Sequence, residues 1–517
     1  MSGQATLIAV FARFKACQRT AALLDGQTLT FDRLYRSALR LALRLRAQGD
    51  GPVVIYGHKQ LAYLTAIWAC IIAGRTFIPT ESDNSVARLQ QIIAGAQATL
   101  LLNLTATPTA SLTAGAWLPV ADGDEAAPTP MLTATIREAA PHQSAYIMFS
   151  SGTTGLPKGI GVSYANVADF LGWIGRDFPL SGAISGNIRY CFDVSLYELW
   201  LSWLFLQPLV VLDHQHFFNT RLALQAHAQQ ATACWVSTPT ITRFYLNDKQ
   251  FNAQTLPALR HFLFCGEVLS KELVSALWQR FPGARITNTY GPTECTVAVT
   301  AIDIQPHHLT DAAALPLGRA RPGTRLTLAT PDASRGELLI SGASVGVGYL
   351  NAPPAQQARF FVNPRGENSY RTGDIVSLQA DVLYFQGRAD REIKLQGYRL
   401  DLNEIEQVLQ SLPQVRDAFV ETWSRQGHLQ GIAAFVLGAE GEPDFALLGQ
   451  LMAQRVPVWM VPKRWYAMSD QYLNFNSKLD RRAVSAATQS QGKYYVYVHD
   501  ADDSPAAAQQ PARHRDS

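Results

Sequence analysis

Short apolar segments alternate with amphipathic segments of helical length in this chain, and this alternation restricts its fold more than any other feature. Residues 28–49 place apolar side chains at helical spacing behind Thr30, a possible N-cap, and PVVIYG then resembles a buried strand. A second helix is predicted over residues 61–74. Further strand-like segments follow at 75–79, 145–149, 208–212, 233–237 and 261–264. Because strands separated by helices build βαβ units, the sequence predicts an α/β fold with parallel strands.

From about residue 315 the pattern changes. Short strands punctuated by Gly and Pro replace the helices, as in RLTLAT, GELLISG and VLYFQG, and they indicate a small β subdomain. After GRADREIKLQGYRL the pattern is that of a compact α+β unit, with helices at 403–411 and 445–454 and strands at 417–423, 430–437 and near 464.

These changes predict a domain organisation. We expect a large N-terminal domain over residues 1–389, made of two βαβ-type subdomains and the small β subdomain. A small, mobile α+β domain is expected over residues 390–490, with a hinge at Asp390. Residues 491–517 are rich in Ala, Gln, Pro and Arg and lack an apolar period, so we expect a disordered tail.

Composition excludes several classes of function. Apolar residues make up 47% and charged residues 16% of the chain, which is ordinary for a globular protein. The net charge of +3 and the absence of a Lys/Arg run argue against a nucleic-acid partner. Six scattered cysteines without a CxxC pair fit thiols in a reducing compartment, and no apolar run of about 18 residues predicts membrane insertion. We therefore expect a cytoplasmic protein.

The segment FSSGTTGLPKG, residues 149–159, carries the first chemical signal. A loop of serines, threonines and glycines after a strand can surround phosphate oxygens with N–H groups and hydroxyls, and Lys158 adds a positive charge. The spacing differs from that of the Walker A loop. A flexible Ser/Gly linker is the alternative, but this segment lies between a strand and a Pro-Lys pair.

This loop resembles the phosphate-binding loop of the adenylate-forming superfamily, which includes acyl-CoA synthetases, luciferases and adenylation domains of nonribosomal peptide synthetases. Six further segments match in the family's order, up to about residue 485: FDVSLYELW at 192–200, NTYGPTE at 288–294, GELLISGASVGVGYLN at 336–351, YRTGD at 370–374, GRADREIKLQGYRLDLNEIE at 387–406 and NSKLDR at 476–481. Such a series is hard to obtain by chance. The resemblance implies ATP as substrate and Mg²⁺ as metal cofactor.

The resemblance also implies roles for single residues toward the nucleotide. An aromatic ring beside an amide can stack on adenine and hydrogen-bond its exocyclic amine, and a carboxylate can hold Mg²⁺. The residues so assigned are, for the phosphates, Ser150, Ser151, Gly152, Thr153, Thr154 and the catalytic Lys158; for adenine, Asn288, Thr289 and Tyr290; for Mg²⁺ and catalysis, Glu294; for the ribose and nucleotide, Asp374 and Arg388. Taken alone, Tyr-Gly-Pro and Thr-Gly-Asp are ordinary turns, and isolated charges such as Arg388 and Asp390 are ordinarily solvated.

Lys478 in NSKLDR matches a lysine that reaches from the small domain to the α-phosphate and the substrate carboxylate, so it is assigned to catalysis. The reaction needs such a cation because a carboxylate attacks an anionic phosphate. The chain departs from the family here, since Ser477 replaces the usual glycine and the preceding loop lacks a proline. Serine adopts a left-handed turn only at an energetic cost, so we expect the lysine loop to be placed differently or to be less mobile.

FDVSLYELW distinguishes between subfamilies. Asp193 would pair with a protonated α-amine, because a buried ammonium needs an opposite charge, and amino-acid-activating members of the family carry an aspartate here. Fatty-acid and aryl-acid activators generally do not. The alternative is that Asp193 caps the helix that begins near Ser195.

Three stretches resemble the D-alanine:D-alanyl carrier protein ligases: STPT at 237–240, FLFCGEVL at 262–269 and NTYGPTECTVAVT at 288–300. Cys265 matches a cysteine that lines the alanine methyl pocket in those ligases, although a buried small hydrophobe is the alternative. The other pocket positions implied are Val194, Gly266 and Val297, together with Tyr197, Leu263, Thr289 and Ala298. Tyr197 is bulkier than the D-alanine pocket requires and would narrow or redirect it.

The expected reaction forms an aminoacyl-adenylate and pyrophosphate from a small amino acid, D-alanine first, and MgATP. The small domain then rotates about Asp390, and the phosphopantetheine thiol of a separate carrier protein attacks. We expect action in trans because no room for a carrier domain follows the small domain. The alternatives are a natural-product ligase for glycine, L-alanine or another small amino acid, an acyl-CoA synthetase, which Asp193 disfavours, and an inactive homologue that binds nucleotide or carrier protein.

Overall fold

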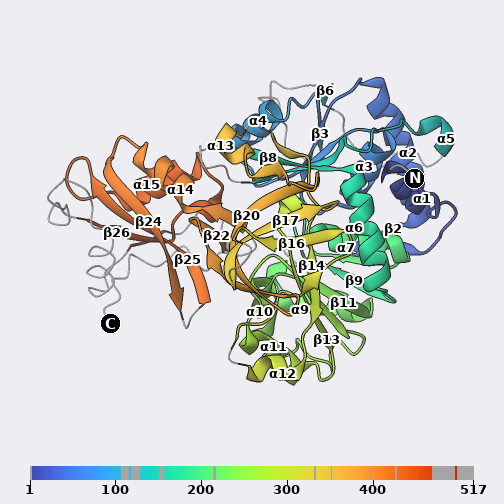
Figure 1. Cartoon of the computed structure of the whole chain (residues 1–517). Coiled ribbons are helices and arrows are strands. Elements are labelled where there is room, and N and C mark those ends of the chain that lie inside the picture. The colour runs from blue at the N-terminus through green and yellow to red at the C-terminus, as the bar shows by residue number, and fades with distance from the viewer. Residues whose placement is uncertain are drawn as a thin grey trace. The chain divides into compact units, whose positions relative to one another are not determined.

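Figure 1 presents a computed structural model of the chain, which describes residues 3–105, 116–117, 129–150, 157–213, 217–311, 313–330, 334–350, 352–395, 398–425, 428–468 and 495–497. These residues form two compact units: the first contains most of the chain up to Asp390, and the second contains the chain from Arg391 together with residues 84–88 and 157. The predicted α/β class is confirmed. Rotation of the second unit about Asp390 stays a prediction.

The described part of the first unit contains a mixed sheet of nine strands. Its interior strands run parallel, and antiparallel strands flank them at both edges. In spatial order the strands are β15 (Arg319–Ala320), β14 (Thr300–Asp303), β13 (Arg285–Tyr290), β12 (His261–Phe264), β11 (Thr232–Ser237), β9 (Ala183–Gly186), β10 (Leu209–Val211), β1 (Thr20–Leu24) and β2 (Gln27–Thr30). The predicted strands at 208–212, 233–237 and 261–264 are confirmed as β10, β11 and β12.

The other βαβ region of the chain forms a second sheet, which has seven strands among the described residues. Its order is β18 (Gly348–Leu350), β8 (Lys158–Ser163), β7 (Ser144–Ser150), β4 (Phe77–Glu81), β3 (Val53–Gly57), β5 (Leu100–Asn103) and β6 (Ala116–Trp117). The pairs β7–β8 and β8–β18 are antiparallel and the others are parallel. This arrangement places β18, a strand far along the sequence, directly beside the strand that begins with Lys158.

One apolar core joins both sheets through helices that pack on one another, several of which lie together in Figure 1. These helices are α1 (Gly3–Ala12), α2 (Phe31–Ala47), α3 (Leu61–Ile72), α6 (Tyr164–Asp177) and α7 (Ser195–Phe205). Helix α2 begins as predicted, because Thr30 Oγ1 accepts a hydrogen bond from Arg33 N at 3.2 Å. Helix α3 is buried along almost its whole length, which is why its sequence is apolar on every side.

The opposite face of the nine-stranded sheet carries its own core. Trp235 and Phe262 point into it, whereas their neighbours Cys234 and Leu263 point into the first core, as the alternation of a strand requires. The helices that cover this face are α9 (Thr220–Gln229), α10 (Pro239–Leu246) and α11 (Lys271–Arg280). The first unit also contains α5 (Leu132–Thr135), α12 (Pro306–Thr310), α13 (Pro354–Gln357), the 3₁₀ turn η1 (Thr293–Cys295) and, from Leu89 onward, α4 (Val86–Gly95).

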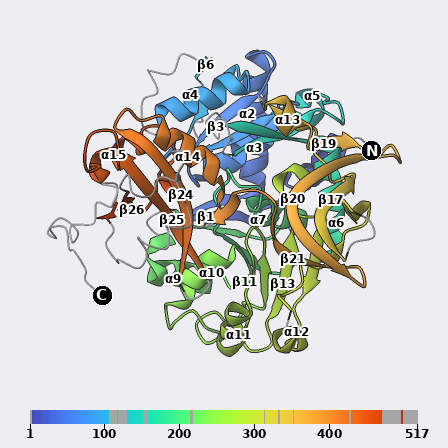
Figure 2. The same cartoon turned by 60° about the vertical axis from the view of Figure 1, so that its left-hand side comes forward.

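The predicted small β subdomain is an antiparallel sheet, whose long strands lie side by side in Figure 2. Its strands are β16 (Thr324–Leu328), β17 (Arg335–Gly342), β19 (Phe360–Val362), β20 (Asn368–Gln379) and β21 (Val382–Arg388). Thr-Gly-Asp at 372–374 lies inside β20, so its interpretation as an ordinary turn is wrong. The strand accommodates it because Gly373 adopts φ +76° and the pairing with both neighbours is irregular nearby.

The second unit, seen in Figure 1, packs two helices on the same face of a four-stranded sheet, counted over its described residues. Its elements are β22 (Glu392–Leu395), β23 (Tyr398–Asp401), α14 (Leu402–Gln410), β24 (Val415–Arg425), β25 (His428–Gly438), α15 (Phe445–Ala453), η2 (Val458–Met460), β26 (Arg464–Ala467) and β27 (Tyr495–Val496). Strand β27 lies within the predicted disordered tail and therefore differs from that prediction. It pairs with β26, and the ring centroid of Tyr495 lies 5.9 Å from that of Phe445. The other tail residues lie outside the described ones.

Within the described ranges, no helix is both long enough and apolar enough to cross a membrane. All six cysteines belong to the described part of the chain, and they form no disulfide. This agrees with the interpretation of the cysteines as thiols.

A buried histidine predicts how stability depends on pH. His227 of α9 places Nδ1 3.0 Å from Thr232 Oγ1, and burial first, with the Lys59 charge second, lowers the pKa of His227 to about 3. Between pH 6.5 and 3 the unfolded chain therefore binds more protons than the folded chain, and stability falls as pH falls. We predict that on acidification to pH 5 the wild type loses about 2 kcal/mol more than His227→Gln, which does not titrate.

Urea unfolding at pH 7.5 and pH 5, followed by tryptophan fluorescence, measures this loss for both proteins. Equal falls of the unfolding midpoint in the two proteins would contradict the prediction.

Candidate functional site

The residues assigned to adenine lie at the carboxyl end of β13. Asn288 Nδ2 donates to the Pro316 carbonyl at 2.7 Å, which orients the amide so that Oδ1 is its acceptor atom. An acceptor is what the exocyclic amine of adenine requires. Thr289 Oγ1 donates to the Phe264 carbonyl at 2.8 Å, so its hydroxyl proton is used in a hydrogen bond to the neighbouring strand β12.

The residues assigned to the ribose form one buried network. Asp374 and Arg388 are cross-strand partners in β20 and β21 and form an ion pair, and Tyr290 Oη donates to the second carboxylate oxygen of Asp374. Burial first, and the Asp374 charge second, raise the pKa of Tyr290 well above its usual value, so the phenol keeps the proton that it donates. A carboxylate has about four lone-pair sites, and this one therefore retains capacity for ribose hydroxyls.

Asp390, the predicted hinge, is held by two arginines. Its Oδ2 lies 2.8 Å from Arg359 Nη2, and its Oδ1 lies 2.6 Å from Arg388 Nε. A Cβ at Gly373 would lie 2.8 Å from Asp390 Oδ2 and 2.9 Å from Arg388 Nη2, so this contact requires glycine in YRTGD. A rotation about Asp390 would have to preserve these two ion pairs or break them.

Two of the residues assigned to the phosphates, Ser150 and Lys158, lie where β7 and β8 pair. Ser150 and Lys158 face each other across these antiparallel strands. Lys158 is 4% exposed, and its Nζ lies 4.7 Å from the centroid of the Tyr349 ring. Glu294 in η1 is fully buried, and its Oε1 accepts a hydrogen bond from Tyr349 Oη at 2.5 Å. A cation and a carboxylate assigned by separate motifs therefore contact the same tyrosine.

Four residues of the phosphate loop, Ser151, Gly152, Thr153 and Thr154, lie outside the described residues. The same holds for Lys478 and the Ser477 departure. Their assigned roles stay predictions.

Asp193 lies in the connection between β9 and α7 and is 8% exposed. Helix α7 begins at Ser195 with Val194 at its N-cap position, and no side chain caps it there. The alternative in which Asp193 is the helix cap is therefore wrong. A buried carboxylate at this position is suited to an ammonium group, because a buried charge needs an opposite charge.

The other predicted pocket residues come together beside Asp193. A Cβ at Gly266 would lie 3.5 Å from Val194 Cγ2, and Gly266 has φ +93°. Cys265 is 1% exposed, and its thiol lies 3.9 Å from the Val297 carbonyl. The fold thus brings Val194 near Gly266 and Cys265 near Val297, four residues that come from the N-terminus of α7, the end of β12 and the turn after η1.

Tyr197 is fully buried in α7, against the rings of Phe170 at 5.2 Å and Phe178 at 6.1 Å. Burial first, and the Cys265 thiolate charge second, raise the pKa of Tyr197 well above its usual value. Its ring is therefore fixed by its neighbours and neutral, and that it narrows the pocket stays a prediction.

Sequence reasoning missed two buried charged residues that support this connection, Glu198 and Lys59. Glu198 Oε1 accepts the N–H groups of Asn187 at 2.7 Å and Ile188 at 3.2 Å, and Lys59 Nζ donates to the Gly186 carbonyl. Burial lowers the pKa of Lys59 to about 8, and burial raises that of Glu198 to about 8. The pair clamps the backbone from which Asp193 is presented. Glu198 was visible in FDVSLYELW, whereas nothing in the sequence marked Lys59.

Arg321 was also missed. Its guanidinium is buried, forms an ion pair of 3.0 Å with Asp169 of α6 and lies 5.4 Å from the centroid of the Trp173 ring. Burial raises the pKa values of Tyr146 and Tyr197, and the positive charge of Arg321 opposes this rise. Asp193 acts on both tyrosines in the opposite sense, so the surroundings of the pocket hold a buried cation as well as a buried carboxylate.

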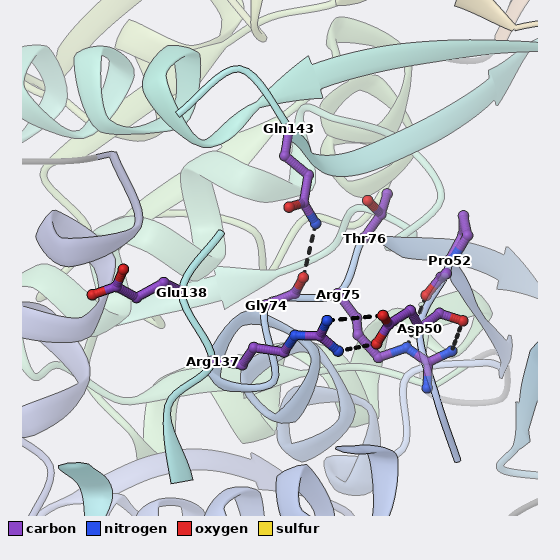
Figure 3. Close-up of a pocket in the computed structure, with 9 residues that line it drawn as sticks. Asp50, Pro52, Gly74, Arg75, Thr76, Arg137, Glu138 and Gln143 are labelled. Atoms are coloured by element: carbon purple, nitrogen blue, oxygen red, sulfur yellow. Dashed lines mark hydrogen bonds and ion pairs between the residues drawn. The ribbon is translucent and has the colours of Figure 1, made fainter. Parts of the chain in front are cut away.

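A polar pocket elsewhere in the first unit is not the predicted site. Figure 3 shows it, with a volume of about 230 Å³ and no predicted site residue in its lining. Arg137 forms an ion pair with Asp50, and Arg75 donates to the Gly51 and Leu45 carbonyls at 2.8 and 3.0 Å. Both arginines thus bind residues at the connection between α2 and β3 and stabilise it.

Comparison with known proteins identifies the family of the chain. The family of AMP-binding enzymes matches the chain over residues 11–350. The chain is 33% identical over 463 residues to a D-alanine--D-alanyl carrier protein ligase of Listeria monocytogenes, covering 86% of this chain and 90% of that one. A ligase of the same name from Bacillus licheniformis is 32% identical, covering 89% and 94%.

A solved structure is similar over nearly the whole chain. It is the Vibrio cholerae adenylation domain AlmE in complex with glycyl-adenosine-5'-phosphate, with a TM-score of 0.81, 27% identity and coverage of 94% of this chain and 98% of that one. The fold, the converging motif residues and these matches agree, and the chain belongs to the family of AMP-binding enzymes, which are ATP- and Mg²⁺-dependent and form AMP.

Proposed function

We propose that this enzyme activates a small amino acid, D-alanine first, as an aminoacyl-adenylate and passes the aminoacyl group to the phosphopantetheine thiol of a carrier protein. The observation that carries the proposal is the buried Asp193 carboxylate next to Val194, which lies near Gly266, while the neighbouring Cys265 thiol faces the Val297 carbonyl. The names of relatives at 32–33% identity support the amino acid and the acceptor.

Substrate selection follows from charge and size. Asp193 would bind the α-ammonium, which holds the substrate carboxylate toward the nucleotide side of the site. Around the side chain, a thiol, a valine and a backbone glycine leave space for a methyl group and supply no second charge. An acyl group without an amine would bring no positive charge to face Asp193, which disfavours fatty and aryl acids.

In the adenylation step, a carboxylate oxygen of the amino acid attacks the α-phosphorus of ATP, and pyrophosphate leaves with the electron pair of the broken P–O bond. Tyr290 and Asn288 would hold the adenine, and Asp374 the ribose, so that the α-phosphorus is in line with the attacking oxygen. Lys478 would neutralise charge that develops on the phosphate oxygens.

Glu294 fits the metal that this reaction requires. Mg²⁺ prefers oxygen ligands and is typically held by one or two carboxylates together with substrate phosphates. When bound, the metal offsets the negative charge of the triphosphate. Glu294 is a buried carboxylate whose orientation is fixed by Tyr349, close to the strand that carries Lys158.

In the transfer step, the phosphopantetheine thiolate attacks the carbonyl carbon of the adenylate. A new C–S bond forms, the C–O bond to the phosphate breaks, and AMP leaves. We propose that the second unit rotates about Asp390 between the two steps, because the adenylation lysine and the thiol need the same approach to the substrate.

Glycine is the second candidate substrate, and Tyr197 favours it. The ring is fully buried and held by Phe170 and Phe178, so it cannot easily move to admit a larger side chain. The Vibrio cholerae relative was solved with glycyl-adenylate bound.

Amino-acid-dependent ATP–pyrophosphate exchange tests the proposal directly. We expect the strongest exchange with D-alanine among D-alanine, L-alanine and glycine. Exchange with glycine alone would keep the adenylation chemistry and change the substrate. Lack of exchange with any amino acid would contradict the proposed function and favour an inactive homologue.

Replacing the proposed amine ligand gives a specific prediction. Asp193→Asn keeps the size of the side chain and removes its charge, so we expect kcat/KM for the amino acid to fall at least about 100-fold, equivalent to about 3 kcal/mol. Equilibrium binding of MgATP should not change. The matched control is Asp303→Asn, at an exposed ion pair with Arg285, which should leave both quantities unchanged. An unaltered kcat/KM for Asp193→Asn would remove this residue from substrate binding.

The assignment of Lys478 gives a second prediction. Lys478→Ala should reduce ATP–pyrophosphate exchange by about 1,000-fold or more, because the charge of the transition state loses its cation, while binding of ATP persists. The control is Lys249→Ala, at an exposed lysine after α10. Exchange at the wild-type rate in Lys478→Ala would exclude this lysine from the mechanism.

A further inference from the structure

Four segments of the sequence meet at the hydroxyl and ring of Tyr349. This residue lies in β18, which pairs with β8 so that Tyr349 is opposite Ile160, two residues after Lys158. Its Oη lies 2.5 Å from Glu294 Oε1 and 2.7 Å from Tyr370 Oη. Its ring centroid lies 4.7 Å from Lys158 Nζ.

The chemistry of these groups fixes the direction of the hydrogen bonds. An ionised carboxylate only accepts, so the single Tyr349 proton goes to Glu294. Tyr370 must then be the donor in the contact between the two hydroxyls. The chain runs from Tyr370 through Tyr349 to Glu294, and it lies among side chains that are at most 8% exposed.

The ring of Tyr349 is fixed as firmly as its hydroxyl. Phe360 of β19 packs against it edge-on, with centroids 5.0 Å apart and an angle of 82° between the planes. The ring face is then left for the ammonium of Lys158, which is attracted by the negative face of an aromatic ring.

The backbone around Tyr349 joins the same two segments. Gly346 N donates to the Glu294 carbonyl at 2.8 Å, and Val347 N donates to the Gly161 carbonyl at 3.0 Å. A Cβ at Gly346 would lie 2.6 Å from the Gly161 carbonyl oxygen, so only glycine permits this approach. Strand β18 therefore holds η1 and β8 together at the level of the main chain, and Tyr349 does so at the level of side chains.

We propose that Tyr349 is a positioning residue for MgATP. Its hydroxyl fixes the orientation of the Glu294 carboxylate toward Mg²⁺, and its ring fixes the Lys158 ammonium beside the phosphates. Hydrogen bonds to a metal-ligating carboxylate from outside the coordination sphere typically change metal affinity by about 10- to 100-fold. The inference rests on the proposed roles of Glu294 and Lys158.

The two contacts can be separated by substitution. Tyr349→Phe keeps the ring over Lys158 and removes the hydroxyl, so it should raise the Mg²⁺ concentration for half-maximal ATP binding by about 10-fold. At saturating Mg²⁺ its affinity for ATP should be close to that of the wild type. Tyr349→Leu removes the ring as well, and it should weaken ATP binding even at saturating Mg²⁺.

Isothermal titration with ATP at a series of Mg²⁺ concentrations, without amino acid, measures this in the absence of turnover. The matched control is Tyr245→Phe, which removes a buried tyrosine hydroxyl that donates to the Phe217 carbonyl in another core, and it should not alter the Mg²⁺ dependence. In a Glu294→Gln background, Tyr349→Phe should add no further shift, because its effect passes through Glu294.

An unchanged Mg²⁺ dependence in Tyr349→Phe would overturn the inference, and so would an equal, additive shift in the Glu294→Gln background. The wild-type titration separates this failure from that of the proposed function. Wild-type ATP binding that does not depend on Mg²⁺ would contradict the roles of Glu294 and Lys158 and the inference with them. Mg²⁺-dependent wild-type binding with an unaltered Tyr349→Phe variant would overturn the inference alone.

Discussion

A charge that is buried away from water has to be balanced inside the protein, and this requirement organises the candidate site. Asp374 is 5% exposed and is balanced by Arg388. The fully buried Glu198 accepts two backbone N–H groups, and the charge of Lys59 opposes the rise in pKa that burial causes. Glu294 is fully buried and is held by Tyr349. Lys59 and Tyr349 come from distant parts of the sequence, whereas Arg388 lies in the strand that follows and pairs with that of Asp374. Since losing one partner leaves a buried charge unbalanced, the segments that carry the chemistry depend on one another.

The sheet brings these segments together. Asp193 follows β9, Gly266 follows β12, and Asn288 and Tyr290 end β13, so the substrate and adenine residues come from the carboxyl ends of strands in the same sheet. Ligands of α/β proteins generally bind at this edge. The antiparallel addition of β18 to β8 then brings a late segment, with Tyr349, beside the phosphate loop.

Much of the architecture could be predicted from the sequence because periodicity and capping are local properties. Thr30 caps α2 as its position indicated, and helix α15 begins at Phe445 as predicted. The errors have physical causes. Thr-Gly-Asp forms part of β20 because Gly373 takes a left-handed φ within a paired strand, and letters alone do not distinguish that from a turn. Strand β27 forms through the packing of Tyr495 on Phe445, in a segment whose composition is otherwise that of a tail.

The contacts within the site could not be predicted in this way, because they join residues that are far apart in sequence. Tyr349 and Tyr370 stood in recognised segments, but nothing in the letters shows that both hydroxyls lead to Glu294. Lys59 carried no signal, since its partner is the carbonyl of Gly186 in a different sheet. Motifs identify which residues are candidates, whereas burial and topology decide which of them share a charge or a proton.

The segment proposed to line the amino-acid pocket shows the same limit most clearly, because its backbone conformation is unusual. Thr296 and Val297 have φ values of +58° and +67°, in a region that β-branched residues rarely adopt. Such strain persists only where the surroundings enforce it, and here the Val297 carbonyl faces the Cys265 thiol while Thr296 Oγ1 donates to the Ser344 carbonyl at 2.7 Å. Glycine and the two enantiomers of alanine differ only in the presence of one methyl group and its direction. A wall of strained backbone can discriminate at that scale, since it cannot relax as an exposed side chain does.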